Sequence, residues 1–122
     1  VIHDWGGAPA TLLPGLSGAA AAPFNNRDLN VIDAAHPIVT GPFGTITDTL
    51  LDDGLFSVHG AWQASSLVTA SDPLAGPVTA VLSSTLATSV SVFEYAYGAG
   101  HIIYANIPLE AYTDSSPLVV GP

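Results

Sequence analysis

The sequence predicts a strand-rich domain with little helix, and three observations support this prediction. Residues 90–97 and 101–107 are rich in β-branched and aromatic residues, which favour extended strands. Gly98 and Gly100 lie between these two runs, and glycine allows the chain to reverse because it adopts positive φ without a Cβ clash. Twelve glycines and ten prolines are spread over the 122 residues, which leaves few positions for a long helix.

Shorter extended segments precede this predicted hairpin. The strand candidates are, in chain order, residues 1–5, 29–32, 55–62 and 77–85. Pro9 and Pro14 disfavour a helix in residues 8–22, and residues 35–44 are predicted to form a rigid, turn-rich segment. Residues 45–51 alternate between apolar and polar only in part, so a strand and a short helix both remain open there.

Side-chain alternation predicts which residues share a face of each strand. In the first strand of the hairpin, one face is expected to carry Val90, Val92 and Glu94. The opposite face is expected to carry Ser91, Phe93, Tyr95 and Tyr97. In the preceding strand, the same rule separates Val78, Ala80 and Leu82 from Thr79, Val81 and Ser83.

The charge balance excludes several classes of partner. The chain has one basic residue, Arg27, against ten acids, and its formal net charge is −9. A surface with so few cations cannot replace the counterions of nucleic-acid phosphates, and anionic membranes repel it. No apolar run reaches the ~18 residues of a membrane span. We therefore expect neither nucleic-acid binding nor membrane insertion.

Residue usage indicates where the protein works. Only 9% of the residues are charged, 48% are hydrophobic, and Lys, Cys and Met are absent. The absence of Cys removes disulfides, thiolate metal sites and cysteine catalysis together. The pattern is typical of a secreted bacterial protein, so we expect an extracellular, cell-surface or periplasmic location.

Three phrases resemble one known family. They are HPI at residues 36–38 with Gly41, SVHG at residues 57–60, and YGAGHIIY at residues 97–104 followed by IPL at residues 107–109 and Tyr112. In this order they resemble the class I glutamine amidotransferase-like domains of the trehalose-utilisation type, found in secreted bacterial proteins. The resemblance implies an α/β fold, a partial flavodoxin-like sheet that ends in a β-hairpin. Residues 1–122 are then a single domain or the C-terminal part of a larger one.

The family's chemistry is not carried over with the fold. The resemblance implies a nucleophilic Cys at a strand-to-helix turn, here near Asp4, Trp5 and Gly6, and the chain has no Cys. Glutamine hydrolysis through a thiolate is therefore excluded. The βαβ units that open such domains are also missing, which leaves a sheet edge for other protein chains or copies of this chain to cover.

The candidate catalytic residues are His3, Asp4 and His59. His3 and Asp4 stand at the end of the first predicted strand, and His59 precedes a glycine. A catalytic role would require the fold to bring them together. The favoured interpretation is structural for all four histidines: His36 caps backbone groups beside Pro37, and His101 packs on Tyr95 or Tyr97.

Oxygen-rich and aromatic residues give further candidates. Asp48, Asp52 and Asp53 are candidate calcium ligands, although their spacing differs from an EF-hand and also fits a surface turn. Glu94 is expected to face solvent or a Tyr hydroxyl, and it cannot be paired with Glu110 from sequence. Aromatic residues that could stack on a sugar, with core packing the favoured alternative, are Trp5, Trp62, Tyr95, Tyr97, Tyr104 and Tyr112.

These observations favour a non-catalytic extracellular module, structural or adhesive, within a cell-surface assembly. No cofactor is expected under this hypothesis. One alternative is a carbohydrate-active or other hydrolase domain that uses His3, Asp4 and His59. Another is a calcium-assisted binding module.

Overall fold

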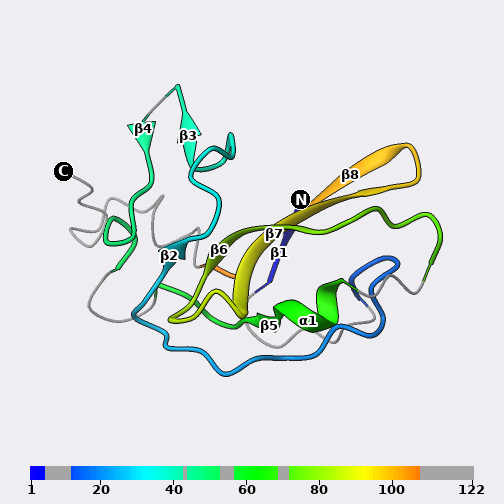
Figure 1. The fold of residues 1–122 in the computed structure, drawn as a ribbon, viewed down its shortest axis with the longest axis horizontal. Helices are drawn as coiled ribbons and strands as arrows, with labels where there is room; N and C mark the ends of the chain where they lie inside the picture. The colour runs from blue at the N-terminus through cyan, green and yellow to red at the C-terminus, as the bar shows by residue number, and fades with distance from the viewer. Residues whose placement is uncertain (5–11, 43, 53–56, 69–71, 108–122) are drawn as a thin grey trace.

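The computed structural model describes residues 1–4, 12–42, 44–52, 57–68 and 72–107. Within these residues the main element is a mixed six-stranded sheet with the order β1-β8-β7-β6-β2, in which β5 also pairs with β7 (Figure 1). Its strands are β1 (Ile2–His3), β2 (Asn30–Val31), β5 (Trp62–Gln63), β6 (Thr79–Ser83), β7 (Ser89–Tyr97) and β8 (Gly100–Ala105). A second sheet contains β3 (Thr40–Gly41) and β4 (Gly44–Thr45), and the helix α1 spans Ala64–Leu67. The strand-rich prediction is confirmed.

The predicted hairpin is present. β7 and β8 pair antiparallel from Val92↔Ala105 to Tyr97↔Gly100, so Gly98 and Ala99 form the turn. Gly98 has φ +57°, which is the positive value that a tight hairpin turn requires at its first central position. A residue with a Cβ is strained in this left-handed region.

Two irregularities in the pairing of β6 with β7 change which residues share a face. The register shifts between Ala80 and Leu82 and again between Leu82 and Ser83. As a result, Val90 packs in the same cluster as Phe93 and Tyr95, while Val92 packs in a different cluster. The expectation that Val90 and Val92 share a face is therefore wrong, because a bulge inserts an extra residue and reverses the alternation beyond it.

The sheet separates two apolar clusters. The first cluster contains Phe93, Tyr95 and Tyr104 of the sheet with Leu16 and Leu67. The second contains Val81, Leu82, Val92 and Ala105 with residues of the segment that leads to β5: Leu29, Val39 and Val58. Figure 1 shows the corresponding layers, with α1 and the early segment below the sheet and the segment that carries β3 and β4 above it.

Both edges of the described sheet are short strands. β1 runs parallel to β8, with Ile2 opposite Tyr104 and His3 opposite Ala105. β2 runs antiparallel to β6 at the other edge. The parallel pairing of β1 has a direct consequence for the site, because it brings the residues that follow both strands to the same end of the sheet.

Three local features were not predicted or were left open. The turn-rich segment 35–44 contributes β3 and the first residue of β4, and residues 47–52 form two successive turns rather than a strand or a helix. The short helix α1 lies between β5 and β6. Among the described residues, no helix has the length and apolarity that a membrane crossing requires.

Candidate functional site

A buried polar cluster lies where β1 and β8 end. The Tyr104 hydroxyl donates to Asp4 Oδ2 at 2.7 Å and accepts from Asn106 Nδ2 at 3.2 Å. Tyr104 and Asn106 are both buried. Burial raises the pKa of the Tyr104 phenol, and the hydrogen bond to the Asp4 carboxylate raises it further. The phenol therefore remains a protonated donor at neutral pH.

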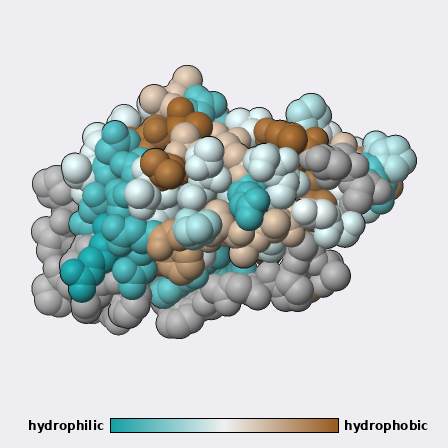
Figure 2. All heavy atoms as spheres, turned by 60° about the horizontal axis from the view of Figure 1, so that its bottom comes forward, coloured by the Kyte–Doolittle hydropathy of each residue, from teal (hydrophilic) through white to brown (hydrophobic). Residues whose placement is uncertain are grey.

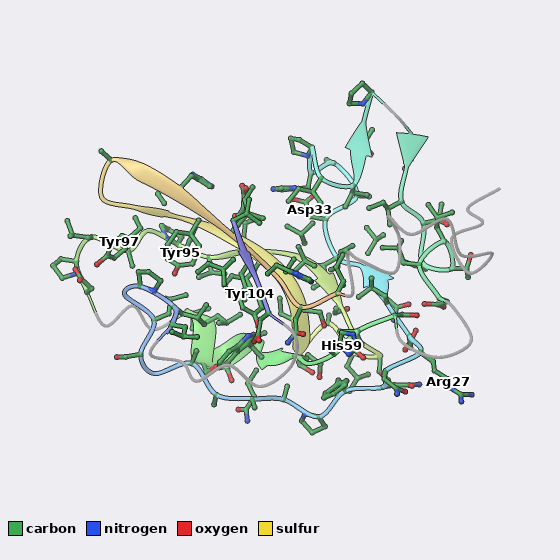
Figure 3. All side chains as sticks on the ribbon, turned by 180° about the vertical axis from the view of Figure 1, so that it is seen from behind. Arg27, Asp33, His59, Tyr95, Tyr97 and Tyr104 are labelled. Carbon is green, nitrogen blue, oxygen red and sulfur yellow. The ribbon has the colours of Figure 1, made fainter. Side chains whose placement is uncertain are left out.

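Both candidate histidines reach the same end of β8. The His3 ring donates through Nε2 to the carbonyl of Ile107 at 2.6 Å. The backbone N–H of His59 donates to the carbonyl of Asn106 at 3.1 Å. The fold thus brings His3, Asp4 and His59 to residues 104–107. Both hydrogen bonds end on backbone carbonyls; the donor is the ring in His3 and the backbone N–H in His59. Figure 3 shows Tyr104 in the middle of the molecule, between the hairpin tyrosines and His59.

Gly60 explains how the segment 57–60 fits against this cluster. A Cβ at position 60 would overlap the side-chain amide of Asn106, so glycine allows this close approach. Ser91 Oγ of β7 donates to the Gly60 carbonyl at 3.1 Å. Sequence analysis missed Asn106, whose only signal is an amide near the end of the strand predicted over residues 101–107.

The other two histidines hold a carboxylate between them. His36 Nε2 lies 3.0 Å from Glu94 Oε1, and His101 Nε2 lies 3.3 Å from Glu94 Oε2. The hydrogen bond from His36 lowers the pKa of Glu94. The expectations that Glu94 faces solvent or a Tyr hydroxyl and that His101 packs on Tyr95 or Tyr97 are wrong, because alternation places 94 and 101 together on the opposite face.

The tautomer of His36 limits what the trio of His36, Glu94 and His101 can bind. The backbone N–H of Ile38 donates to His36 Nδ1 at 3.2 Å, which confirms the predicted capping role. A neutral ring whose Nδ1 accepts a hydrogen bond carries its proton on Nε2. That Nε2 donates to Glu94 and has no lone pair for a metal ion. The trio therefore anchors the segment at His36 to the sheet.

The candidate calcium ligands cap the edge strand β2. Asp52 Oδ1 accepts from the Leu29 N–H at 2.8 Å, and Asp48 Oδ1 accepts from the Val31 N–H at 2.7 Å. Desolvation raises the pKa of Asp52, and repulsion by the nearby carboxylates adds to this shift. Asp53 lies outside the described residues. Across the described part of the chain, no group of three or more His, Asp or Glu residues is arranged to hold a metal ion.

Three of the four aromatic candidates in the described part of the chain belong to the core. Phe93 and Tyr104 stack with ring centroids 4.8 Å apart, and Trp62 meets Tyr104 edge-on at 6.1 Å. The Tyr95 hydroxyl donates to the carbonyl of Pro14 at 2.8 Å, and burial raises the pKa of Tyr95 to about 12. Core packing, the favoured interpretation, is confirmed for these residues. Trp5 and Tyr112 lie outside the described residues.

Tyr97 differs from the buried tyrosines. Its ring is half-buried near the hairpin turn, and its hydroxyl donates to Asp72 Oδ2 at 3.1 Å. This hydrogen bond raises the pKa of the Tyr97 phenol. The side chain thus fastens the end of β7 to the segment that precedes β6.

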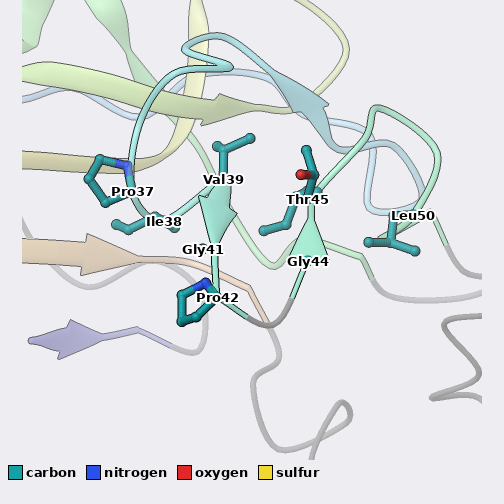
Figure 4. A pocket seen from close by; sticks show the side chains of 9 residues that line it. Pro37, Ile38, Val39, Gly41, Pro42, Gly44, Thr45 and Leu50 are labelled. Carbon is teal, nitrogen blue, oxygen red and sulfur yellow. The ribbon is translucent and has the colours of Figure 1, made fainter.

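An apolar pocket opens beside the second sheet. We call the β3–β4 hairpin that forms this sheet the arm, and we call the pocket the arm pocket. Its volume is about 520 Å³ and it is lined by Pro37, Ile38, Val39, Gly41, Pro42, Gly44, Thr45, Ile46 and Leu50. Figure 4 shows Pro37 and Ile38 on one side of β3 and β4 and Leu50 on the other. All nine residues are uncharged, and among them only Val39 is fully buried. The arrangement can take up an apolar side chain.

Apolar residues are also exposed elsewhere. Figure 2 shows several separate brown groups among polar residues on the face that points down in Figure 1. A second hollow of about 460 Å³ is lined in part by Phe24 and Leu86, which are 45% and 62% exposed. The described surface therefore combines a low charge content with accessible apolar side chains.

Comparison with known proteins gives no match to a protein-family model, to a curated protein sequence or to a solved structure.

Proposed function

We propose that this chain is a non-catalytic extracellular module that binds other protein chains, or copies of itself, in a structural or adhesive assembly at the cell surface. The observation that carries this proposal is the arm pocket, an uncharged and open hollow of about 520 Å³. Contiguous apolar surface on a soluble protein often marks a site where a partner binds. The composition, with no Lys and no Cys, supports the extracellular location.

The polar clusters support a non-catalytic role. Asp4 accepts from a buried phenol, His3 donates to a backbone carbonyl, and Glu94 is held by two imidazoles. Each of these contacts connects distant segments of the chain.

We further propose that the sheet is the C-terminal part of a flavodoxin-like fold of the amidotransferase type. Two features support this relation: the parallel pairing of β1 with β8 and the closing β7–β8 hairpin. The three phrases that carry the resemblance also pack together. Residues 57–60 contact the end of β8, and His36 of the HPI phrase contacts β7.

The test of the proposed function is the mass of the native material. Size-exclusion chromatography with light scattering should give a mass above the 12.4 kDa of the chain, and cross-linking with mass spectrometry should identify the second chain or a copy. A lone 12.4 kDa species at every concentration, with no other chain in the native preparation, would overturn the proposal.

A hydrolase, carbohydrate-active or of another kind, is the second candidate. The observation that favours it is the convergence of His3, Asp4 and His59 on residues 104–107. Turnover of chromogenic glycosides and esters decides between the two. The leading proposal expects no turnover above buffer, whereas turnover that Asp4→Asn and His59→Ala both abolish would establish the hydrolase.

A calcium-assisted binding module is the third candidate. Its support is the proximity of Asp28 and Asp48 to Asp52: desolvation is the main cause of the raised pKa of Asp52, and these two carboxylates add to it. A ligand that binds the folded state raises its melting temperature. The leading proposal expects the same melting temperature with calcium chloride and with an equal ionic strength of sodium chloride.

A further inference from the structure

The turn that follows β4 presents two different sets of side chains. Ile46 and Leu50 line the arm pocket. Asp48 and Asp52, which lie between and after them in the chain, instead accept hydrogen bonds from the edge strand β2. One short segment therefore joins an apolar wall to a pair of carboxylates, and the two features have a fixed relation to each other.

The chain segment that carries the arm pocket is acidic. Residues 27–52 contain four aspartates, at 28, 33, 48 and 52, against the single basic residue Arg27. Asp48 and Asp52 are exposed. Desolvation is the main cause of the raised pKa of Asp52, and the nearby Asp28 and Asp48 carboxylates add to it, so these three negative charges lie close to one another. Such a group of charges attracts a cationic partner and repels an anionic one.

The pocket has a firm base. Val39 is 1% exposed and belongs to the second apolar cluster. His36, three residues earlier, is held by Glu94 of β7 and by the Ile38 N–H. A base that is already ordered lowers the entropy lost on binding. One of the four aspartates, Asp33, lies on the same side of the molecule as the β3–β4 arm (Figure 3).

We propose that the arm pocket binds a basic, apolar segment of a partner protein, with one apolar side chain in the pocket and flanking lysine or arginine side chains facing the aspartates. This proposal rests on the proposed function and names the chemistry of its partner. A second copy is a poor occupant, because each copy has a net charge of −9 and one basic residue. The binding should weaken as salt is added, since the rim charges are exposed.

The first experiment measures the binding of three short synthetic peptides by isothermal titration calorimetry. The first peptide has one leucine flanked on each side by two lysines. In the second, serine replaces the leucine, and in the third, glutamates replace the lysines. The first peptide should bind about tenfold or more tightly than either control, a difference of about 1.4 kcal/mol, and its affinity should fall with salt.

Variants of the chain locate the binding site. Leu50→Ser removes an apolar wall, and Asp48→Asn removes a charge while keeping an oxygen that can accept from Val31. Each should lower the affinity for the peptide with one leucine and four lysines about fivefold to tenfold. The matched controls are Leu86→Ser, a leucine that is exposed outside the pocket, and Asp72→Asn, an acid beside Tyr97. Both controls should bind like the wild type, and circular dichroism should show that all four variants are folded.

Several outcomes would overturn this proposal while leaving the proposed function intact. Equal binding of the leucine and serine peptides would reduce the effect to general charge attraction. Equal losses in Leu50→Ser and Leu86→Ser would place the site elsewhere. Self-association that Leu50→Ser abolishes would identify a second copy as the occupant. By contrast, the proposed function fails on the native mass measurement, whatever the peptides do.

Discussion

Two β-hairpins of the described chain, β7–β8 and β3–β4, are held in different ways. β7 and β8 pair at six positions, from Val92↔Ala105 to Tyr97↔Gly100, and both contribute fully buried side chains to the first apolar cluster. β3 and β4 pair at two positions, and all four of their residues are exposed. The long hairpin is stabilised by its own burial, whereas the arm depends on flanking residues that pack elsewhere, such as Val39.

The comparison shows that one chain can place its stable core in one hairpin, β7–β8, and an accessible surface on another, β3–β4. Isolated two-stranded hairpins are marginal in water, so the arm persists because Val39 and His36 connect it to the sheet. Its exposed strands remain available to a partner. The long hairpin, with its aromatic side chains buried on one face, has less surface to offer.

The largest expected effect is a core truncation in the long hairpin. Phe93→Ala should lower the free energy of unfolding by about 3–5 kcal/mol, because it leaves a cavity beside Tyr95 and Tyr104. Leu50→Ala, in the turn that follows the arm, should cost less than about 1 kcal/mol, because its side chain is already partly exposed. Urea unfolding monitored by fluorescence measures both. Similar losses would remove the contrast between the hairpins.

A smaller effect is expected at the turn of the long hairpin. Gly98→Val should cost about 1–3 kcal/mol, because φ is +57° there and a β-branched residue is strained in that region. Gly100 is the internal control, since it is described and lies outside the positive-φ glycines. Gly100→Val should change the melting temperature little. A larger loss of stability in Gly100→Val than in Gly98→Val would contradict the turn geometry.

The edge beside the arm should respond to the loss of a hydrogen-bond acceptor. Asp48→Ala leaves the Val31 N–H without its carboxylate and should cost about 0.5–1.5 kcal/mol. Asp48→Asn retains an acceptor and should cost less. The two variants are compared by urea unfolding at the same ionic strength. If they are equally destabilised, the negative charge matters more than the acceptor.

The smallest effect concerns the link between the arm segment and the long hairpin, and it depends on pH. The pKa of Glu94 is lowered in the folded state, so its stabilising contribution is present above the unfolded pKa and is lost as the pH falls through the folded pKa. Glu94→Gln should be less stable than the wild type at neutral pH, by less than about 1 kcal/mol. The difference should begin to shrink near pH 4.5, the ordinary value for this group, and should vanish only below the lower pKa that Glu94 has in the folded state. Thermal unfolding at a series of pH values tests this, and a constant difference would contradict it.

The sequence alone predicted the features that depend on near neighbours. Alternating β-formers around Gly98 indicated the long hairpin, and the apolar runs indicated β1, β2 and β6 close to where they lie. His36 was expected to cap backbone groups, and it does so two residues away at Ile38. These features follow from backbone propensity and turn chemistry, which act over a few residues.

Tertiary structure decided everything that joins distant parts of the chain. Tyr104 meets Asp4 across 100 residues, and no local spacing encodes that contact. The bulges that separate Val90 from Val92, and the choice of His36 and His101 as partners of Glu94, depend on how β6, β7 and β8 align. Register and pairing minimise the free energy of the whole packed sheet, so they are settled only when both apolar clusters close around it.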